Sequence, residues 1–218
     1  MGDDDYDPEY QCDFLLDVCS HVKDCETKTG LRVLPSLQSV FQSAPSVWII
    51  DLSKRKTSIL LEVLKLQPEK KQVKLRGCSD EESEVRSLLQ CLPYISQLSC
   101  DPDFFQRVCT SISVKSRQEV QQLVSLLKLL DFTLQLTGEL NRKTCGTVGR
   151  VLGLCSSNVD LILTPRKVSV RGASLLFRPS TQLHSLRLSS HMVLLLLTGQ
   201  RGRLFLFGLA VTSFLCSP

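Results

Sequence analysis

A short phrase recurs along this chain: an apolar residue, any residue, a leucine, and then polar residues. Clear copies span residues 50–53, 73–76, 134–137, 161–164 and 186–189, and a weaker copy spans residues 96–99. The leucine of each copy lies at position 52, 75, 98, 136, 163 or 188, so the successive gaps are 23, 23, 38, 27 and 25. Such self-similarity is typical of repeat proteins, whose units are each too small to bury their own apolar faces.

The period and the phrase together predict leucine-rich repeats, because four of the five gaps fall within the roughly 20–29 residues of that repeat. Cys78 follows Leu75 by three residues, where the repeat has Asn or Cys. Apolar residues recur at helical spacing in residues 59–66, 85–92 and 148–155, and the gap of 38 holds two such patterns, near 104–112 and 120–130. We therefore expect the α/β class: a leucine-rich-repeat solenoid of about six repeats, with parallel strands on the concave side and helices on the convex side.

The ends of the chain fit this pattern less well. Residues 1–13 hold six acids and no base, which predicts an acidic disordered tail before a solenoid over residues 14–190. Residues 191–218 lack the phrase. This apolar C-terminal segment is either a cap, with a hairpin from Val193 to Gly208 over the open end of the solenoid, or a truncated end with exposed apolar surface.

The sequence favours neither a secretory route nor a membrane span. Met1 and Gly2 are followed by acidic residues, the opposite of a basic signal region. The ten cysteines are therefore expected to be reduced core residues of a cytoplasmic protein. Arg201 and Arg203 interrupt the apolar C-terminal segment, and each would cost roughly 2.5–3.5 kcal/mol at mid-membrane.

The formal net charge of +4 is unevenly distributed. From Asn141 onward there are ten basic residues and one acid, Asp160, which gives 10 − 1 = +9, so the part of the chain before Asn141 carries 4 − 9 = −5. A basic half can attract nucleic acid, and a nucleic-acid-sensing surface stays the alternative function. The basic residues form no dense run, which favours a solvated surface and a protein partner.

No motif predicts catalysis, a metal or a cofactor. Cys19 and His21 are the only close cysteine–histidine pair, and two residues apart on a helix they would point in different directions. A zinc site of Cys12, Cys19, His21 and Cys25 lacks the paired C-x-x-C spacing. We expect Cys19 to pack with its apolar neighbours Phe14, Leu15 and Val18 on a terminal helix. Helix packing explains the glycine pair at residues 146 and 149 better than nucleotide binding does.

Three segments carry a specific resemblance: residues 93–101 (PYISQLSCD), 172–177 (GASLLF) and 181–188 (TQLHSLRL). They resemble repeats of large fish NOD-like-receptor-type proteins, which combine a NACHT nucleotide-binding module with leucine-rich repeats. The resemblance covers about residues 31–189 and implies a ribonuclease-inhibitor-like solenoid. It further implies a non-catalytic protein–protein interaction scaffold, the ligand-sensing or regulatory repeat region of a cytosolic innate-immune receptor or a fragment of one. The sequence departs from the family in having no G-x-x-x-x-G-K-[ST] loop.

The residues that flank each leucine of the phrase are the predicted binding site, because they would point away from the core on the concave face. The predicted partner-binding residues are Asp51, Lys74, Arg76, Gln97, Gln135, Thr137 and Arg187. The same row would hold Ser53, Ser99, Ile162, Thr164 and Ser189. We expect this rigid face to bind more strongly than the long helix side chains Glu62, Lys65, Glu84 and Arg86, which are costly to order.

Overall fold

The protein has a mixed α/β fold with two small parallel sheets. The computed structural model describes residues 8–42, 45–52, 57–77, 79–177, 183–198 and 214–216. The chain divides into two compact units, an amino-terminal unit over Met1–Asp101 and a carboxy-terminal unit over Pro102–Pro218. Cys78 and Ser53, on which two predictions rest, lie outside the described residues.

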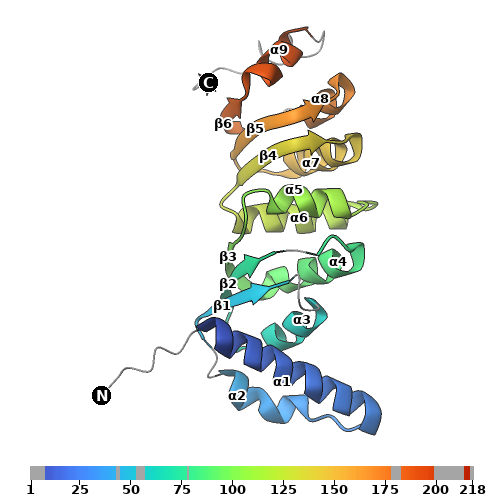
Figure 1. Ribbon diagram of the computed structural model, residues 1–218, viewed down its shortest axis with the longest axis vertical. Helices are drawn as coiled ribbons and strands as arrows, with labels where there is room; N and C mark the ends of the chain where they lie inside the picture. The colour runs from blue at the N-terminus through green and yellow to red at the C-terminus, as the bar shows by residue number, and fades with distance from the viewer. Residues whose placement is uncertain are drawn as a thin grey trace, which may run out of the picture. The chain divides into compact units, whose positions relative to one another are not determined.

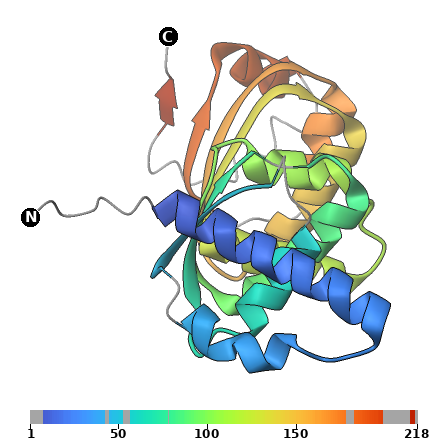
Figure 2. The same cartoon turned by 60° about the horizontal axis from the view of Figure 1, so that its bottom comes forward.

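The amino-terminal unit is a parallel sheet in the order β1-β2-β3, joined by helical crossovers. Figure 1 shows α3 and α4 on one side of this sheet. In Figure 2 the unit is turned so that α1 comes forward, with α2 beside it. Its elements are α1 (Pro8–Thr29), η1 (Leu34–Leu37), α2 (Gln38–Gln42), β1 (Val47–Asp51), α3 (Thr57–Lys65), β2 (Lys71–Arg76), α4 (Glu82–Cys91), η2 (Leu92–Tyr94) and β3 (Ile95–Ser99).

The carboxy-terminal unit repeats this plan with a parallel sheet in the order β4-β5-β6-β7. Helices α7 and α8 pack against each other on one side of that sheet (Figure 1). Its elements are α5 (Phe104–Ser111), α6 (Arg117–Leu129), β4 (Thr133–Leu140), α7 (Arg142–Leu154), β5 (Val159–Val168), α8 (Val170–Leu176), β6 (Leu183–Leu188), α9 (Ser190–Thr198) and β7 (Phe214–Cys216). The two helical patterns predicted in the long gap are confirmed as α5 and α6.

Neighbouring strands pair at a nearly constant distance along the sequence. Val73 lies opposite both Trp48 and Leu98, so the offsets in the first sheet are 73 − 48 = 25 and 98 − 73 = 25. Leu161 lies opposite both Leu134 and Leu186, so the offsets in the second sheet are 161 − 134 = 27 and 186 − 161 = 25. From β1 to β3 and from β4 to β6, a strand and its crossover helix therefore recur at offsets of 25 to 27, and β7 pairs with β6 at an offset of 214 − 186 = 28.

This pairing corrects the predicted equivalence of Leu52, Leu75 and Leu98. Leu75 lies opposite Ile50, and Leu98 lies opposite Val73, so the copies at residues 52 and 98 were each aligned two residues away from their true partners. The error arose because the inward positions of a strand recur every second residue, and Leu52, which follows β1, is buried like a strand residue. With the observed register, the gaps of 23 become offsets of 25.

The buried side of each sheet is formed by the alternating apolar residues. All six leucines of the phrase are buried, and Leu136 and Leu163 have no exposed surface, which confirms that they point inward. In β2 the pattern is strict, with Val73 and Leu75 buried and Gln72, Lys74 and Arg76 exposed. Half-buried strands of this kind leave one polar face in each unit.

Side-chain caps start several of the helices. The Ser116 hydroxyl accepts the Glu119 amide of α6, and the Glu119 carboxylate accepts the Ser116 amide, which forms a capping box. Asn141 caps α7 through the Thr144 amide at 2.8 Å. Ser169 caps α8 through the Gly172 amide at 3.0 Å. These caps satisfy amides that the first turn leaves without helical partners.

Two predicted boundaries differ from the structure. Helix α1 begins at Pro8, so the predicted disorder of residues 1–13 is wrong for residues 8–13, and residues 1–7 lie outside the described part. Glu9 lies in the first turn of α1, where the helix dipole favours a negative charge.

At the other end, α9 runs through Ser190–Thr198 and crosses the predicted boundary between residues 190 and 191. The predicted hairpin is therefore wrong for residues 193–198, since consecutive leucines are good helix formers and no turn residue precedes Gly199. The rest of that prediction lies outside the described residues. No helix of the described part is long and apolar enough to cross a membrane.

Candidate partner-binding surfaces

The exposed side of the first sheet brings together four of the predicted binding residues. We define the amino-terminal strand face as Asp51, Gln72, Lys74, Arg76, Gln97 and Ser99. Within it Asp51 lies opposite Arg76, Lys74 lies opposite Ser99, and Gln97 lies opposite Gln72. Asp51, Lys74 and Gln97 were predicted to be equivalent positions of successive strands. In the corrected register, none of the three lies opposite another.

Charge on this face is partly compensated from outside the sheet. The Arg76 guanidinium forms an ion pair with the Glu9 carboxylate of α1. Lys74 is exposed and forms no ion pair with any residue that the structure describes. Lys74 is thus the cation of this face that is available to a partner, whereas Arg76 would first have to leave Glu9. Sequence reasoning missed Glu9 because it assigned that residue to a disordered tail.

The exposed side of the second sheet brings together the other three predicted residues. We define the carboxy-terminal strand face as Gln135, Thr137, Ile162, Thr164 and Arg187. Ile162 lies between Gln135 and Arg187, and Thr137 lies opposite Thr164. Arg187 is exposed, and Gln135 and Thr137 are half-buried.

The main chain of Thr137 is held by a side chain from α5. The Thr137 amide donates to Gln106 Oε1 at 2.7 Å, and Gln106 Nε2 donates to the Thr137 carbonyl at 2.9 Å. The Gln106 amide group therefore occupies both hydrogen-bonding positions that a neighbouring strand would use at this point of β4. This contact fixes the edge of the carboxy-terminal strand face.

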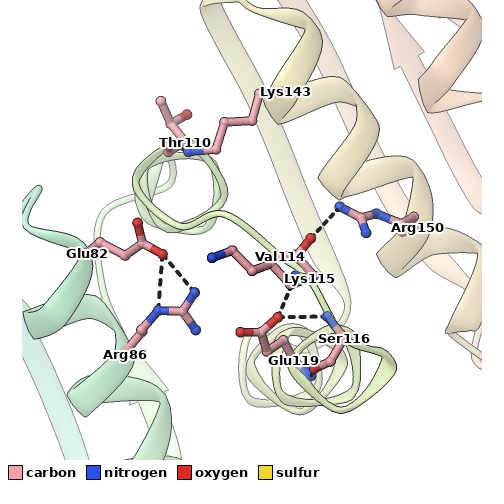
Figure 3. A network of polar contacts seen from close by, with 9 residues as sticks. All are labelled: Glu82, Arg86, Thr110, Val114, Lys115, Ser116, Glu119, Lys143 and Arg150. Atoms are coloured by element: carbon pink, nitrogen blue, oxygen red, sulfur yellow. Dashed lines mark hydrogen bonds and ion pairs between the residues drawn. The ribbon is translucent and has the colours of Figure 1, made fainter.

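The helix charges of the amino-terminal unit are more ordered than predicted. Glu84 of α4 accepts the Thr57 amide at 2.6 Å, and the Thr57 hydroxyl donates to the Glu84 carbonyl at 2.9 Å, so Glu84 caps the first turn of α3. Glu62 forms ion pairs with Lys23 and Lys65. Arg86 pairs with Glu82 at 2.7 Å (Figure 3). Each of these four side chains has a polar partner on its own or a neighbouring helix, which sequence reasoning did not predict.

A pocket of about 790 Å³ lies beside α7 in the carboxy-terminal unit. Its walls are formed by one face of α7, by the connection between α5 and α6, and by α8. The lining residues are Ser113, Val114, Arg142, Lys143, Gly146, Thr147, Gly149, Arg150, Gly153 and Leu175. Three of them are cationic and none is acidic. We call this the α7 pocket.

Two of the three cations reach across the pocket to main-chain oxygens. Lys143 Nζ donates to the Thr110 carbonyl at 3.0 Å, and Arg150 Nη2 donates to the Val114 carbonyl at 3.1 Å (Figure 3). Glu119 fixes the segment that carries Val114, since its carboxylate accepts the amides of Lys115 and Ser116. Arg150 is therefore hydrogen-bonded to the segment that Glu119 holds, and Lys143 is hydrogen-bonded to the end of α5.

Glycines on α7 determine how closely α8 approaches. A Cβ at Gly149 would lie 2.1 Å from the Leu175 carbonyl oxygen, whereas one at Gly146 would meet only Leu175 Cδ1 at 3.8 Å. Gly149 is thus required for the contact between the two helices, which confirms the helix-packing prediction for Gly149 but not for Gly146. Gly146 is instead an open position in the pocket wall.

Sequence reasoning missed the α7 pocket, although a signal was present. Arg142, Gly146, Gly149, Arg150 and Gly153 follow one another at intervals of four, three, one and three residues. That spacing places them on one helix face. The residues were considered only as a glycine pair and as scattered charges, so their common face was not recognised.

The buried cysteines are poor candidates for chemistry. Burial raises the pKa of the Cys19 thiol to about 11, against a smaller opposing effect of Lys23. Burial likewise raises the pKa of Cys91 to about 12. Cys19 and Leu15 are both buried and Val18 is half-buried, as expected of a packed helix face, whereas Phe14 is 56% exposed and the prediction is wrong for it.

The four residues considered as zinc ligands differ in their exposure. Cys12 and Cys19 are buried, whereas His21 and Cys25 are exposed. Across the described part of the chain, no group of three or more histidine, cysteine or acidic side chains is placed to hold a metal ion.

Comparisons with protein-family models, with curated proteins and with solved structures found no match.

Proposed function

We propose that this chain is a leucine-rich-repeat solenoid that binds a protein partner through its two strand faces. In this proposal it acts as a non-catalytic scaffold in the cytoplasm. It is the ligand-sensing or regulatory repeat region of an innate-immune receptor of the NOD-like type, or a fragment of one. The observation that carries the proposal is the regular pairing of parallel strands, at sequence offsets of 25 to 27, with a polar face on each sheet.

Physical chemistry favours the strand faces over the helices as the binding surface. A hydrogen-bonded strand ladder holds its side chains with little remaining backbone freedom, so less conformational entropy is lost when a partner binds. Lys74 and Arg187 are both exposed cations, Lys74 on the central strand of the first sheet and Arg187 beside Ile162 on the second. The helix charges of the amino-terminal unit are engaged in ion pairs and caps, and a partner would have to displace those contacts.

The test compares proteins captured by the full chain and by two charge-reversed variants. The strand variant is Lys74→Glu with Arg187→Glu. The control variant is Lys70→Glu with Lys128→Glu, which makes the same change of charge at two exposed residues outside both faces. Glu62 and Arg86 are unsuitable as controls because both form ion pairs.

A true partner should be retained by the control and weakened more than tenfold by the strand variant, about 1.4 kcal/mol or more. Quantitative mass spectrometry of the captured proteins, followed by calorimetry with each purified candidate, gives this comparison. If every captured protein depends on the control lysines and none on the strand cations, the strand faces are not the binding surface.

Nucleic-acid sensing is the second candidate, and the charge of +9 from Asn141 onward favours it. Binding of this kind releases counterions, so its affinity falls steeply with salt. Fluorescence anisotropy with short single-stranded RNA and DNA at about 50 and 200 mM salt measures that slope. A steep loss of affinity between the two would support nucleic-acid sensing, and no binding at the lower concentration would eliminate it.

A further inference from the structure

The α7 pocket concentrates positive charge that nothing in the described chain neutralises. Arg142, Lys143 and Arg150 line it, and none of them forms an ion pair within the described residues. Its volume of about 790 Å³ falls in the range of roughly 300–1,000 Å³ that holds small ligands. An anion entering the pocket would meet three cations and no competing carboxylate.

The cations keep free donors after their protein contacts are made. Lys143 uses one of its three N–H donors on the Thr110 carbonyl, and Arg150 uses one of its five on the Val114 carbonyl. Their fixed placement reduces the entropy that would be lost on binding. Arg and Lys are the side chains that bind phosphate oxygens, Arg by a planar fork and Lys as a point charge.

The two ends of the pocket differ in a way that selects an elongated ligand. Arg142 and Lys143 are the first two residues of α7, a helix of 13 residues, so the helix dipole adds to their charge. Arg150 lies eight residues further along, which is about 12 Å at the rise of an α-helix. A compact anion would occupy only one end.

Between the two ends α7 contributes Gly146 and Gly149, which have no side chains. Val114 and Leu175 add apolar lining beside the polar Ser113 and Thr147. Such a surface suits a flat ring system, and the Arg150 guanidinium can stack on an aromatic ring. A phosphate chain at Arg142 and Lys143, with a planar base toward Arg150, uses every part of the pocket.

We propose that the α7 pocket binds a nucleoside polyphosphate, held by side-chain cations and not by a glycine-rich phosphate loop. This inference is independent of the strand faces, so a failure of either proposal leaves the other standing.

The test uses ATP and inorganic tripolyphosphate as probes of the full chain, by calorimetry at about 150 mM salt, where exposed charges are well screened. ATP should bind at a single site, and tripolyphosphate should compete for it with at least tenfold weaker affinity because it lacks the ring. Arg142→Glu with Lys143→Glu should weaken ATP more than tenfold. The matched control is Arg166→Glu with Lys167→Glu, an adjacent exposed pair of β5 that does not line the pocket.

A second variant separates a shaped pocket from a merely basic surface. Gly146→Phe fills the pocket without changing its charge, and its Cβ meets only ordinary contact with Leu175. It should weaken ATP more than tenfold and leave the melting temperature near that of the parent chain. Equal binding of ATP and tripolyphosphate, wild-type affinity in Gly146→Phe, or the same loss in the Arg166/Lys167 control would each overturn the proposal. Binding of a single-stranded oligonucleotide with full retention in Gly146→Phe would instead assign the cations to nucleic acid.

Discussion

Leu136 is a sensitive residue of the second sheet, because its side chain is fully buried in the middle of β4. Replacing it with Ala removes buried methyl groups and leaves a cavity among well-packed neighbours. We expect Leu136→Ala to lower the free energy of unfolding by about 2–5 kcal/mol, measured by urea denaturation. Thr133→Ala, at an exposed position of the same strand, should change it by no more than about 0.5 kcal/mol. A loss at Leu136 below about 1 kcal/mol would contradict its inward orientation.

Cysteine reactivity should follow burial across the described chain. Burial raises the pKa of Cys145 to about 11 and also raises the pKa of fully buried Cys109, so both thiols stay protonated at neutral pH. Cys25 is exposed. A thiol reagent at neutral pH should therefore label Cys25 in the native protein, and Cys109 and Cys145 only after unfolding, as followed by peptide mass mapping.

The same pKa shifts have a consequence for stability. A thiol whose pKa is higher in the folded than in the unfolded state stabilises the fold fully below its unfolded pKa of about 8.5. That stabilisation declines as the pH rises through the folded values near 11 and 12 for Cys19, Cys91 and Cys145.

In the labelling experiment, rapid reaction of Cys109 in the native state would show that α5 is not packed as described.

The contact between α7 and α8 depends on one glycine, and its neighbour provides the control. Gly149→Ala would place a Cβ 2.1 Å from the Leu175 carbonyl oxygen, so α8 would have to shift. Overpacking of this kind costs about 1–3 kcal/mol. Gly146→Ala meets only the Leu175 side chain at 3.8 Å and should gain up to about 1 kcal/mol from helix propensity. Thermal melts of the two variants should therefore shift in opposite directions, and equal shifts would contradict the packing.

The sequence predicted strands and helices better than it predicted their alignment. A leucine at every second position identifies a strand, and the six leucines of the phrase are all buried. The same alternation cannot distinguish a position from its neighbour two residues away. Leu52 and Leu98 were therefore misaligned until the pairing of Ile50 with Leu75 and of Val73 with Leu98 fixed the register.

The candidate sites also differ in how far the sequence alone could predict them. Residues of the strand faces follow from alternation alone, so their exposure was predictable. The Arg76–Glu9 ion pair joins residues 67 positions apart, and the α7 pocket needs α8 and the segment at Val114 to form its walls. Contacts between distant segments leave no periodic trace in one sequence, which is why these features became visible only in three dimensions.

At the scale of the whole chain, the role of the apolar C-terminal segment can be tested by truncation. Met192 of α9 is fully buried, whereas Leu194 is 63% exposed, so the first turns of α9 contribute to the core and also present apolar surface. Deleting residues 191–218 should lower the melting temperature of the carboxy-terminal unit by several degrees, because 1 kcal/mol corresponds to about 4–8 °C in a unit of this size. Leu194→Ser should improve solubility without that loss. An unchanged melting curve after truncation would show that α9 is not part of the core.

The Gln106 contact also bears on how this protein avoids misassembly. β4 is the first strand of its sheet, and an unpaired strand edge is a template on which other chains can add and grow into fibrils. By bonding both the amide and the carbonyl of Thr137, one glutamine side chain occupies the place that an invading strand would need. A strand adding at this point of β4 would first have to break these two hydrogen bonds, so the Gln106 contact opposes edge-to-edge pairing there.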